Sequence, residues 1–133
     1  MRGTLGDIDP AAIYCSRNED SERLIRMDAS RPEEWSNTDI DLTIWRATTT
    51  IISEKIVARI LPEFLRRVIR EPDAGWMTSG DVVRQKLERS HFATWAEADR
   101  EAVLALLPLY IATPDTDSES LAVWLDAFSR KDT

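Results

Sequence analysis

Cysteine and histidine are almost absent from this chain, whose 133 residues include one of each. A structural zinc site needs about four Cys or His ligands and a catalytic one about three, so the composition excludes a Cys/His zinc site within the chain. The single cysteine, Cys15, has no second thiol with which to form an intramolecular disulfide, which fits a reducing compartment. We therefore expect a cytoplasmic protein that holds no metal.

Glycine is also scarce, and no glycine-rich motif is present. A phosphate-binding loop and a dinucleotide fingerprint both need several glycines at fixed, short spacing. The four glycines of this chain are scattered at positions 3, 6, 75 and 80. We therefore expect no nucleotide cofactor, and no other cofactor motif is present.

The usual catalytic groups of side chains are missing too. A Ser-His-acid triad would have to use His91, and no serine lies in a nucleophile-elbow motif. Asp115, Asp117 and Glu119 have the spacing of the first three ligands of an EF-hand loop, but Ser120 occupies the position that requires glycine. The sequence therefore nominates no catalytic residue and favours a protein that is not an enzyme.

No apolar run is long enough to cross a membrane. The longest, Ala102–Ala112, contains Pro108 and is much shorter than the ~20 residues that a spanning helix needs. The first ten residues also lack the apolar segment of a secretory signal. We expect no membrane contact, and we assign this run to a buried core helix.

What the sequence does contain fits one compact unit. Hydrophobic residues make up 43% of the chain and charged residues 31%, and a chain of this length can bury a core without disulfides. No internal repeat is present. We predict a single domain over residues 1–133, with a looser N-terminal region at 1–38 and a helical core at 39–133.

Helix signals dominate the C-terminal two thirds. Apolar residues at helical spacing predict helices over residues 53–70, 79–89, 95–112 and 116–128, with caps at Ser53, at Thr78 or Ser79, at Thr94 and at Thr116. Pro62 should either kink the first helix or begin a second one. The helix at 95–112 is apolar on all sides and should be the most buried. The fold class is therefore mainly α, a bundle-like domain of four to five helices.

Residues 40–46 are open to two interpretations. Ile40, Leu42 and Ile44 alternate with polar residues, which is typical of a strand, and residues 24–27 are the short apolar run that would complete a hairpin. Alternatively, Asp39 caps a helix whose apolar face contains Ile40, Ile44 and Ala47.

The net charge of −7 is unevenly distributed. Residues 1–45 carry five basic and ten acidic groups, residues 46–90 nine and six, and residues 91–133 three and eight. On a helical projection four basic side chains of the middle segment share one face: Lys55, Arg59, Arg66 and Arg70. We interpret this basic stripe first as a solvated face or a partner for the acidic flanks, then as a site for an acidic protein surface, and last as a weak site for nucleic acid or phosphate.

Tryptophan is frequent, with five residues. Because tryptophan is enriched at binding hot spots, any exposed one indicates an interface. Trp95 and Trp124 lie in predicted helices and favour core packing, whereas Trp35 and Trp76 lie in loop-like sequence. We nominate Trp35 and Trp76, together with the basic stripe, as candidate partner-binding residues.

Residues 53–110 resemble small helical bacterial proteins of unknown function. The resemblance rests on the helix pattern Ile60-Leu61-Pro62-Glu63-Phe64-Leu65 and on a later pattern that contains Asp99, Arg100, Glu101, Ala102, Val103, Leu107 and Tyr110. It implies a helical bacterial cytoplasmic protein and carries over no catalytic residue.

These observations predict a small cytoplasmic protein that acts through protein contacts, as a regulatory, adaptor or immunity-type binding protein. Its acidic net charge would suit a basic partner, and it disfavours nucleic acid and anionic membranes. The alternatives are an enzyme that uses only carboxylates and arginines, and a weak nucleic-acid or phosphate binder that uses the basic stripe.

Overall fold

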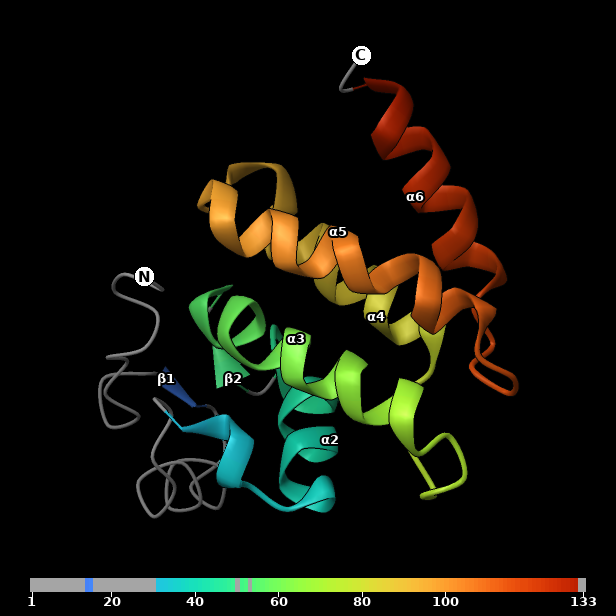
Figure 1. Cartoon of the computed structure of the whole chain (residues 1–133). Coiled ribbons are helices and arrows are strands. Elements are labelled where there is room, and N and C mark those ends of the chain that lie inside the picture. Colours follow the sequence, from blue (N-terminus) through green and yellow to red (C-terminus); the bar gives the residue numbers. More distant parts are fainter. Residues whose placement is uncertain (1–13, 16–30, 50, 53, 132–133) are drawn as a thin grey trace.

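The computed structural model describes residues 14–15, 31–49, 51–52 and 54–131, and it is mainly helical (Figure 1). Five α-helices occur in these ranges: α2 (Asn37–Arg46), α3 (Glu54–Arg70), α4 (Gly80–Arg89), α5 (Glu97–Ala112) and α6 (Glu119–Lys131). Two short 3-10 helices, η3 (Pro32–Glu34) and η4 (Phe92–Thr94), precede α2 and α5. The prediction of a mainly α, bundle-like domain with four to five helices is confirmed.

Of the two interpretations of residues 40–46, the helix is confirmed and the strand is wrong, because these residues belong to α2. The side chain of Ser36, rather than that of Asp39, caps this helix by accepting a hydrogen bond from the Asp39 N–H. Ile40, Ile44 and Ala47 are each 0% exposed, so the four-residue spacing of a helix decides which side chains are buried. The predicted partner at residues 24–27 lies outside the described residues.

A two-stranded antiparallel sheet does form, but at other positions. β1 (Tyr14–Cys15) pairs with β2 (Ile51–Ile52), in the register Tyr14 to Ile52 and Cys15 to Ile51. The β-branched residues Ile51 and Ile52, which follow α2, therefore form the strand, whereas the sequence pattern indicated one at residues 40–46.

Helix α3 forms the centre of the core. Six of its apolar side chains are 0% exposed: Ile56, Val57, Ile60, Leu61, Phe64 and Leu65. The helix packs against α2, α4, α5 and η3. Pro62 lies inside one helix that continues from Glu54 to Arg70, so no second helix begins there.

The prediction that residues 95–112 form the most buried helix is wrong. Helix α5 packs along α3, but only Val103, Leu107 and Tyr110 are buried, and these three share one face. The opposite face is exposed, and Leu109 keeps 56% of its surface exposed. Four of the eight exposed residues of α5 are alanines, whose exposure to water costs little because they present little apolar area.

Two of the predicted caps are also replaced. Ser79 caps α4 as expected, accepting from the Val82 N–H. Helix α5 instead begins after Ala96, which offers no side-chain cap, while the Thr94 hydroxyl donates to the His91 carbonyl at 2.7 Å. Helix α6 begins after Ser118, whose carbonyl accepts from the Ala122 N–H, and not at Thr116.

Buried polar side chains fasten the N-terminal elements to α3. The Arg67 guanidinium, 5% exposed, donates five hydrogen bonds of 2.6–3.2 Å, to the backbone carbonyls of Pro32, Glu33 and Trp35 and to the side chains of Asn37 and Glu63. Through these hydrogen bonds, the Arg67 side chain holds the end of η3 and the start of α2 against α3.

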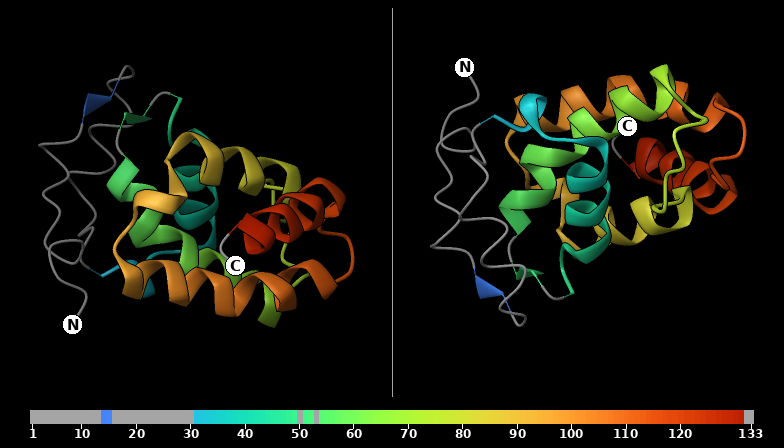
Figure 2. Two further views of the ribbon diagram at one scale, coloured as in Figure 1. Left: turned by 90° about the horizontal axis from the view of Figure 1, so that it is seen from above. Right: turned by 90° about the horizontal axis from the view of Figure 1, so that it is seen from below.

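Two further contacts join α2 to the segment that begins α4. The buried carboxylate of Asp41 accepts from the N–H groups of Met77 (2.6 Å) and Thr78 (3.0 Å). At the end of α2, the Ala47 carbonyl accepts from the buried Lys86 ammonium at 2.6 Å. These contacts set the position of α4, and Figure 2 shows that α6 then lies between α4 and α5.

Candidate functional site

A groove with a volume of about 650 Å³ lies between α4 and α6. On α4 the lining side chains follow the spacing of one helix face: Asp81, Arg84 and Glu88. The loop before α6 and α6 itself contribute the opposite wall: Asp117, Glu119, Ser120, Val123, Trp124 and Ala127. The groove is open to solvent, so a side chain of another molecule can enter it.

The α4 wall carries a connected network of polar side chains. Arg84 donates to Asp81 (3.0 Å), to Ser120 (3.2 Å) and to Glu88, and the Ser120 hydroxyl donates to Asp81 (2.8 Å). The hydrogen bond from Ser120, followed by that from Arg84, lowers the pKa of Asp81 below its ordinary value. The carboxylate therefore stays ionised, and the network links α4 to α6.

The groove carries a negative net charge. Four carboxylates line it, and Arg84 is the single cation in its lining. Within the described part of the chain, Asp117 and Glu119 have no ion pair and no side-chain hydrogen bond, so their charges face solvent or a ligand. Such a rim attracts basic groups.

The floor of the groove is apolar. Val123 is 68% exposed, so its apolar side chain is accessible to a ligand in the groove. Trp124 is partly buried: it stacks on Phe128 with ring centroids 5.2 Å apart and meets Phe92 edge-on at 5.7 Å. These ring contacts hold the indole in place beside Val123, so the apolar floor is preorganised.

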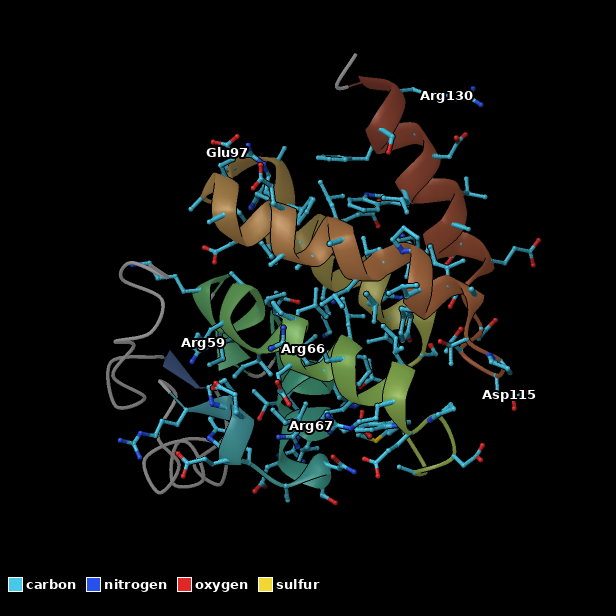
Figure 3. All side chains as sticks on the ribbon, viewed as in Figure 1. Arg59, Arg66, Arg67, Glu97, Asp115 and Arg130 are labelled. Carbon is cyan, nitrogen blue, oxygen red and sulfur yellow. The ribbon has the colours of Figure 1, made fainter. Side chains whose placement is uncertain are left out.

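The structure does not assemble the predicted basic stripe into one solvated face. The Arg59 side chain is 5% exposed and lies 3.5 Å from Glu33, and Arg66 pairs with Glu63 at 3.0 Å. Lys55 and Arg70 are exposed near opposite ends of α3, about 22 Å apart along the axis. Figure 3 shows Arg59 and Arg66 at separate positions along the helix.

A small cleft of about 180 Å³ runs beside Arg59 and Arg66, between α3 and α5. Asp99 of α5 also lines it, so the cleft contains both signs of charge. Burial alone would raise the pKa of Glu63, but the hydrogen bonds from Arg67 and Arg66 hold that pKa below its ordinary value. Arg59 and Arg66 therefore form ion pairs with carboxylates of the same chain, Glu33 and Glu63.

The two nominated tryptophans are not freely exposed. Trp35 is 7% exposed and belongs to the core. Trp76 is partly buried, its Nε1 donates to the Glu71 carbonyl at 2.8 Å, and its ring meets Phe64 edge-on. The exposed tryptophan is Trp45, at 42%, which lies on the outer face of α2 and was not nominated.

The sequence analysis also missed Arg67 and the groove. Arg67 could have been found, because on a helical projection it falls among the apolar residues of α3, where a charged side chain needs buried partners. The spacing of Asp81, Arg84 and Glu88 shows that they share a helix face, but nothing in the sequence shows that α6 lies opposite.

Among the described residues, no three His, Cys, Asp or Glu side chains gather closely enough to hold a metal ion. None of the helices in these ranges is long and apolar enough to span a membrane. His91 is exposed and adopts a left-handed backbone conformation (φ 54°) in the turn between α4 and η4.

Comparisons with protein-family models, with curated proteins and with solved structures find no match to this chain. The resemblance of residues 53–110 to small helical bacterial proteins therefore stays a prediction.

Proposed function

We propose that this protein is a binding module whose α4–α6 groove docks a basic, amphipathic helix of a partner protein. One observation carries the proposal: four carboxylates surround an apolar floor on which Val123 is 68% exposed. Acidic rims around apolar contacts match a helix that carries lysine or arginine beside an apolar stripe.

The dimensions support a helical occupant. Helix α4 contains ten residues, which corresponds to a length of about 15 Å, or nearly three helical turns. A partner helix of that length would place apolar side chains on Val123 and Trp124, while its basic side chains would reach Glu88, Asp117 and Glu119. Desolvating the apolar floor would supply affinity, and the carboxylates would set orientation and the rate of association.

The class of partner follows from the charge. A basic toxin or a nucleic-acid enzyme would present such a helix, and a regulatory, adaptor or immunity-type role fits a small acidic binding protein. A cytoplasmic location agrees with the single cysteine.

The proposal is tested with a synthetic helical peptide of leucine and lysine arranged as an amphipathic helix. Binding is measured by ¹⁵N NMR titration of the full chain, and the expected result is saturable shifts of amides in α4 and α6. A peptide with glutamate in place of lysine should cause no such shifts. Shifts that map elsewhere, or equal binding of the glutamate peptide, would contradict the proposal.

A matched pair of variants distinguishes binding in the groove from nonspecific hydrophobic binding of the peptide. Val123→Asn removes the exposed apolar floor and should weaken binding of the leucine-lysine peptide about tenfold. Leu109→Asn makes the same change at a 56% exposed position on α5, outside the groove, and should leave affinity unchanged. Because both side chains are exposed, neither variant should unfold the protein, and equal effects of the two would overturn the proposal.

The other two functions stay predictions. An enzyme based on carboxylates and arginines predicts stabilisation by divalent metals or phosphorylated ligands in a thermal-shift screen. A nucleic-acid binder predicts salt-sensitive binding to the basic stripe, two of whose members, Arg59 and Arg66, contact carboxylates of the same chain.

A further inference from the structure

A second cavity, of about 360 Å³, lies at the end of the molecule where two loops meet. One loop joins α3 to α4 and the other joins α5 to α6, and both lie at the same end in Figures 1 and 2. The first loop contributes Asp73 and Trp76, the second Asp115, and α5 contributes Tyr110. The cavity therefore combines two aromatic side chains with two carboxylates, and Figure 3 shows Asp115 on the loop that joins α5 to α6.

Trp76 is held firmly in the wall of this cavity. Its Nε1 donates to the Glu71 carbonyl at 2.8 Å, and its ring meets Phe64 with centroids 5.6 Å apart and planes at 83°. Since the tryptophan is only partly buried, part of the indole remains accessible. An aromatic ring that is fixed and accessible offers a cation its negative face.

Tyr110 contributes an unused polar group. It is 1% exposed, its ring lies 6.2 Å from that of Phe64, and its hydroxyl forms no hydrogen bond with any described residue. The hydroxyl oxygen is not among the fully buried unpartnered atoms of the described residues, and the Tyr110 side chain lines the cavity. The phenol oxygen is therefore available to a donor on a ligand.

The electrostatic field at this cavity is negative. Burial raises the pKa of Tyr110, and the neighbouring charges of Asp41 and Asp117 raise it further. Within the part of the chain that the structure describes, Asp73 and Asp115 have no ion pair and no side-chain hydrogen bond. The cavity thus offers acceptors whose charges are not neutralised.

Four backbone N–H groups near the cavity already have hydrogen-bond partners. The N–H groups of Met77 and Thr78 donate to Asp41, that of Gly80 donates to the Thr116 carbonyl, and that of Val82 donates to Ser79. These four N–H groups are therefore not free to bind an anion, whereas the side chains of Asp73, Asp115 and Tyr110 offer acceptors to a cation.

We propose that this cavity binds the guanidinium group of an arginine side chain. A guanidinium is planar, so it can stack on the Trp76 indole, and its N–H groups match the separated acceptors Tyr110, Asp73 and Asp115. A lysine ammonium offers no plane to stack and is more strongly hydrated, so it should bind less well. The site is separate from the α4–α6 groove, and its test does not depend on groove binding.

The probe is Nα-acetyl-L-arginine amide, titrated into the full chain and followed by ¹⁵N NMR. We expect saturable shifts of the Trp76 indole N–H and of amides in residues 73–79 and 113–117. The matched citrulline compound has the same shape without the charge and should cause no saturable shift at the same concentrations. Equal shifts with citrulline, or no saturable shift with arginine, would overturn the proposal.

Two conservative variants locate the site. Tyr110→Phe removes the unpartnered hydroxyl without breaking a hydrogen bond between described residues, and Asp115→Asn keeps a residue type that tolerates the φ of 64° found there. Each should weaken arginine binding about tenfold while the spectrum stays that of a folded protein. Asp126→Asn, an exposed carboxylate on α6, is the control and should bind as the parent does. Parent-like binding by both cavity variants would overturn the proposal.

Discussion

At the scale of single residues, a few buried polar side chains position the helices. Arg67, Asp41 and Lys86 are 5%, 7% and 2% exposed, and each bonds to backbone groups of another element. Hydrogen bonds of this kind have fixed directions, whereas apolar contacts do not, so these residues restrict how α2, α3 and α4 are arranged.

Replacing Arg67 by methionine should cause a large loss of stability. The change keeps much of the side-chain volume but removes the buried hydrogen bonds from Arg67 to three carbonyls and to one oxygen of the Glu63 carboxylate. We expect the free energy of unfolding to fall by about 3–5 kcal/mol in urea titrations. Arg70→Met, at the exposed end of the same helix, should cost less than about 1 kcal/mol. Similar losses for both variants would contradict the role of Arg67.

Lys86 should make stability depend on pH in the alkaline range. Burial, and to a smaller extent the charge of Arg89, lowers its pKa from 10.5 to about 8. As the pH rises above 8 the folded state releases this proton while the unfolded state keeps it until about 10.5, so the contribution of Lys86 to stability increases with pH and is lost as the pH falls through 8.

The measurement compares urea unfolding of the parent and of Lys86→Met at several pH values. The stability of the parent relative to the variant should increase by about 2 kcal/mol between pH 8 and pH 10. The titration of Tyr110, whose pKa is raised by burial, affects both proteins equally and cancels. A difference that does not change over this range would show that Lys86 titrates normally.

At the scale of elements, the helices differ in whether a side chain caps the free N–H groups of their first turn. Ser36 and Ser79 cap α2 and α4, but α5 begins at Ala96 without a side-chain cap. The predicted cap at Thr94 fails because η4 occupies residues 92–94, and the Thr94 hydroxyl donates to the His91 carbonyl within that turn. Helix α5 therefore lacks the stabilising side-chain cap that α2 and α4 have.

Ala96→Ser should therefore stabilise the protein. The backbone at this position already has cap geometry (φ −57°, ψ 143°), and the side chain is exposed, so serine fits without rearrangement. We expect a gain of about 0.5–1 kcal/mol in the free energy of unfolding. Ala93→Ser, an exposed position in η4, should have little effect, and a gain of the same size there would argue against capping.

At the scale of the whole molecule, protection against unfolding should decrease from α3 towards the end of α6. Helix α3 packs on four other elements, whereas α6 packs on α4 and α5, and the exposure of its side chains increases beyond Phe128. Amides at 63–65 should exchange with solvent at the rate of global unfolding, and those at 129–131 should exchange by local opening. Hydrogen exchange measured by NMR tests this order, and equal protection of the two segments would refute it.

Much of the helical content could be predicted from the sequence, because α3, α4 and α6 combine apolar residues at helical spacing with helix-start signals. Residues 40–46 could not be assigned to one structure, because Ile40 and Ile44 lie four positions apart. That spacing places two side chains on the same face both in a strand and in a helix. The burial of α5 was misjudged for a related reason: an apolar residue such as Leu109 is buried only where a neighbouring element covers it.

The candidate site depended even more on tertiary structure. The sequence indicated that Asp81, Arg84 and Glu88 share a helix face, and it supplied Asp117 and Glu119 nearby in the chain. It did not indicate that Val123 would remain uncovered, or that Arg59 would lie beside Glu33. Contacts between residues far apart in the chain leave no periodic signal in a single sequence.

Composition and periodicity by themselves determined that this protein is helical, acidic and poor in the side chains of common catalytic and metal sites. These properties are local or additive, so they can be read from neighbouring residues and from totals. Only the folded chain decided which face of α5 is buried, which arginines are paired, and where acidic and apolar side chains meet in a groove and a cavity. Those properties depend on which elements pack together, because burial and desolvation are set by neighbours in space.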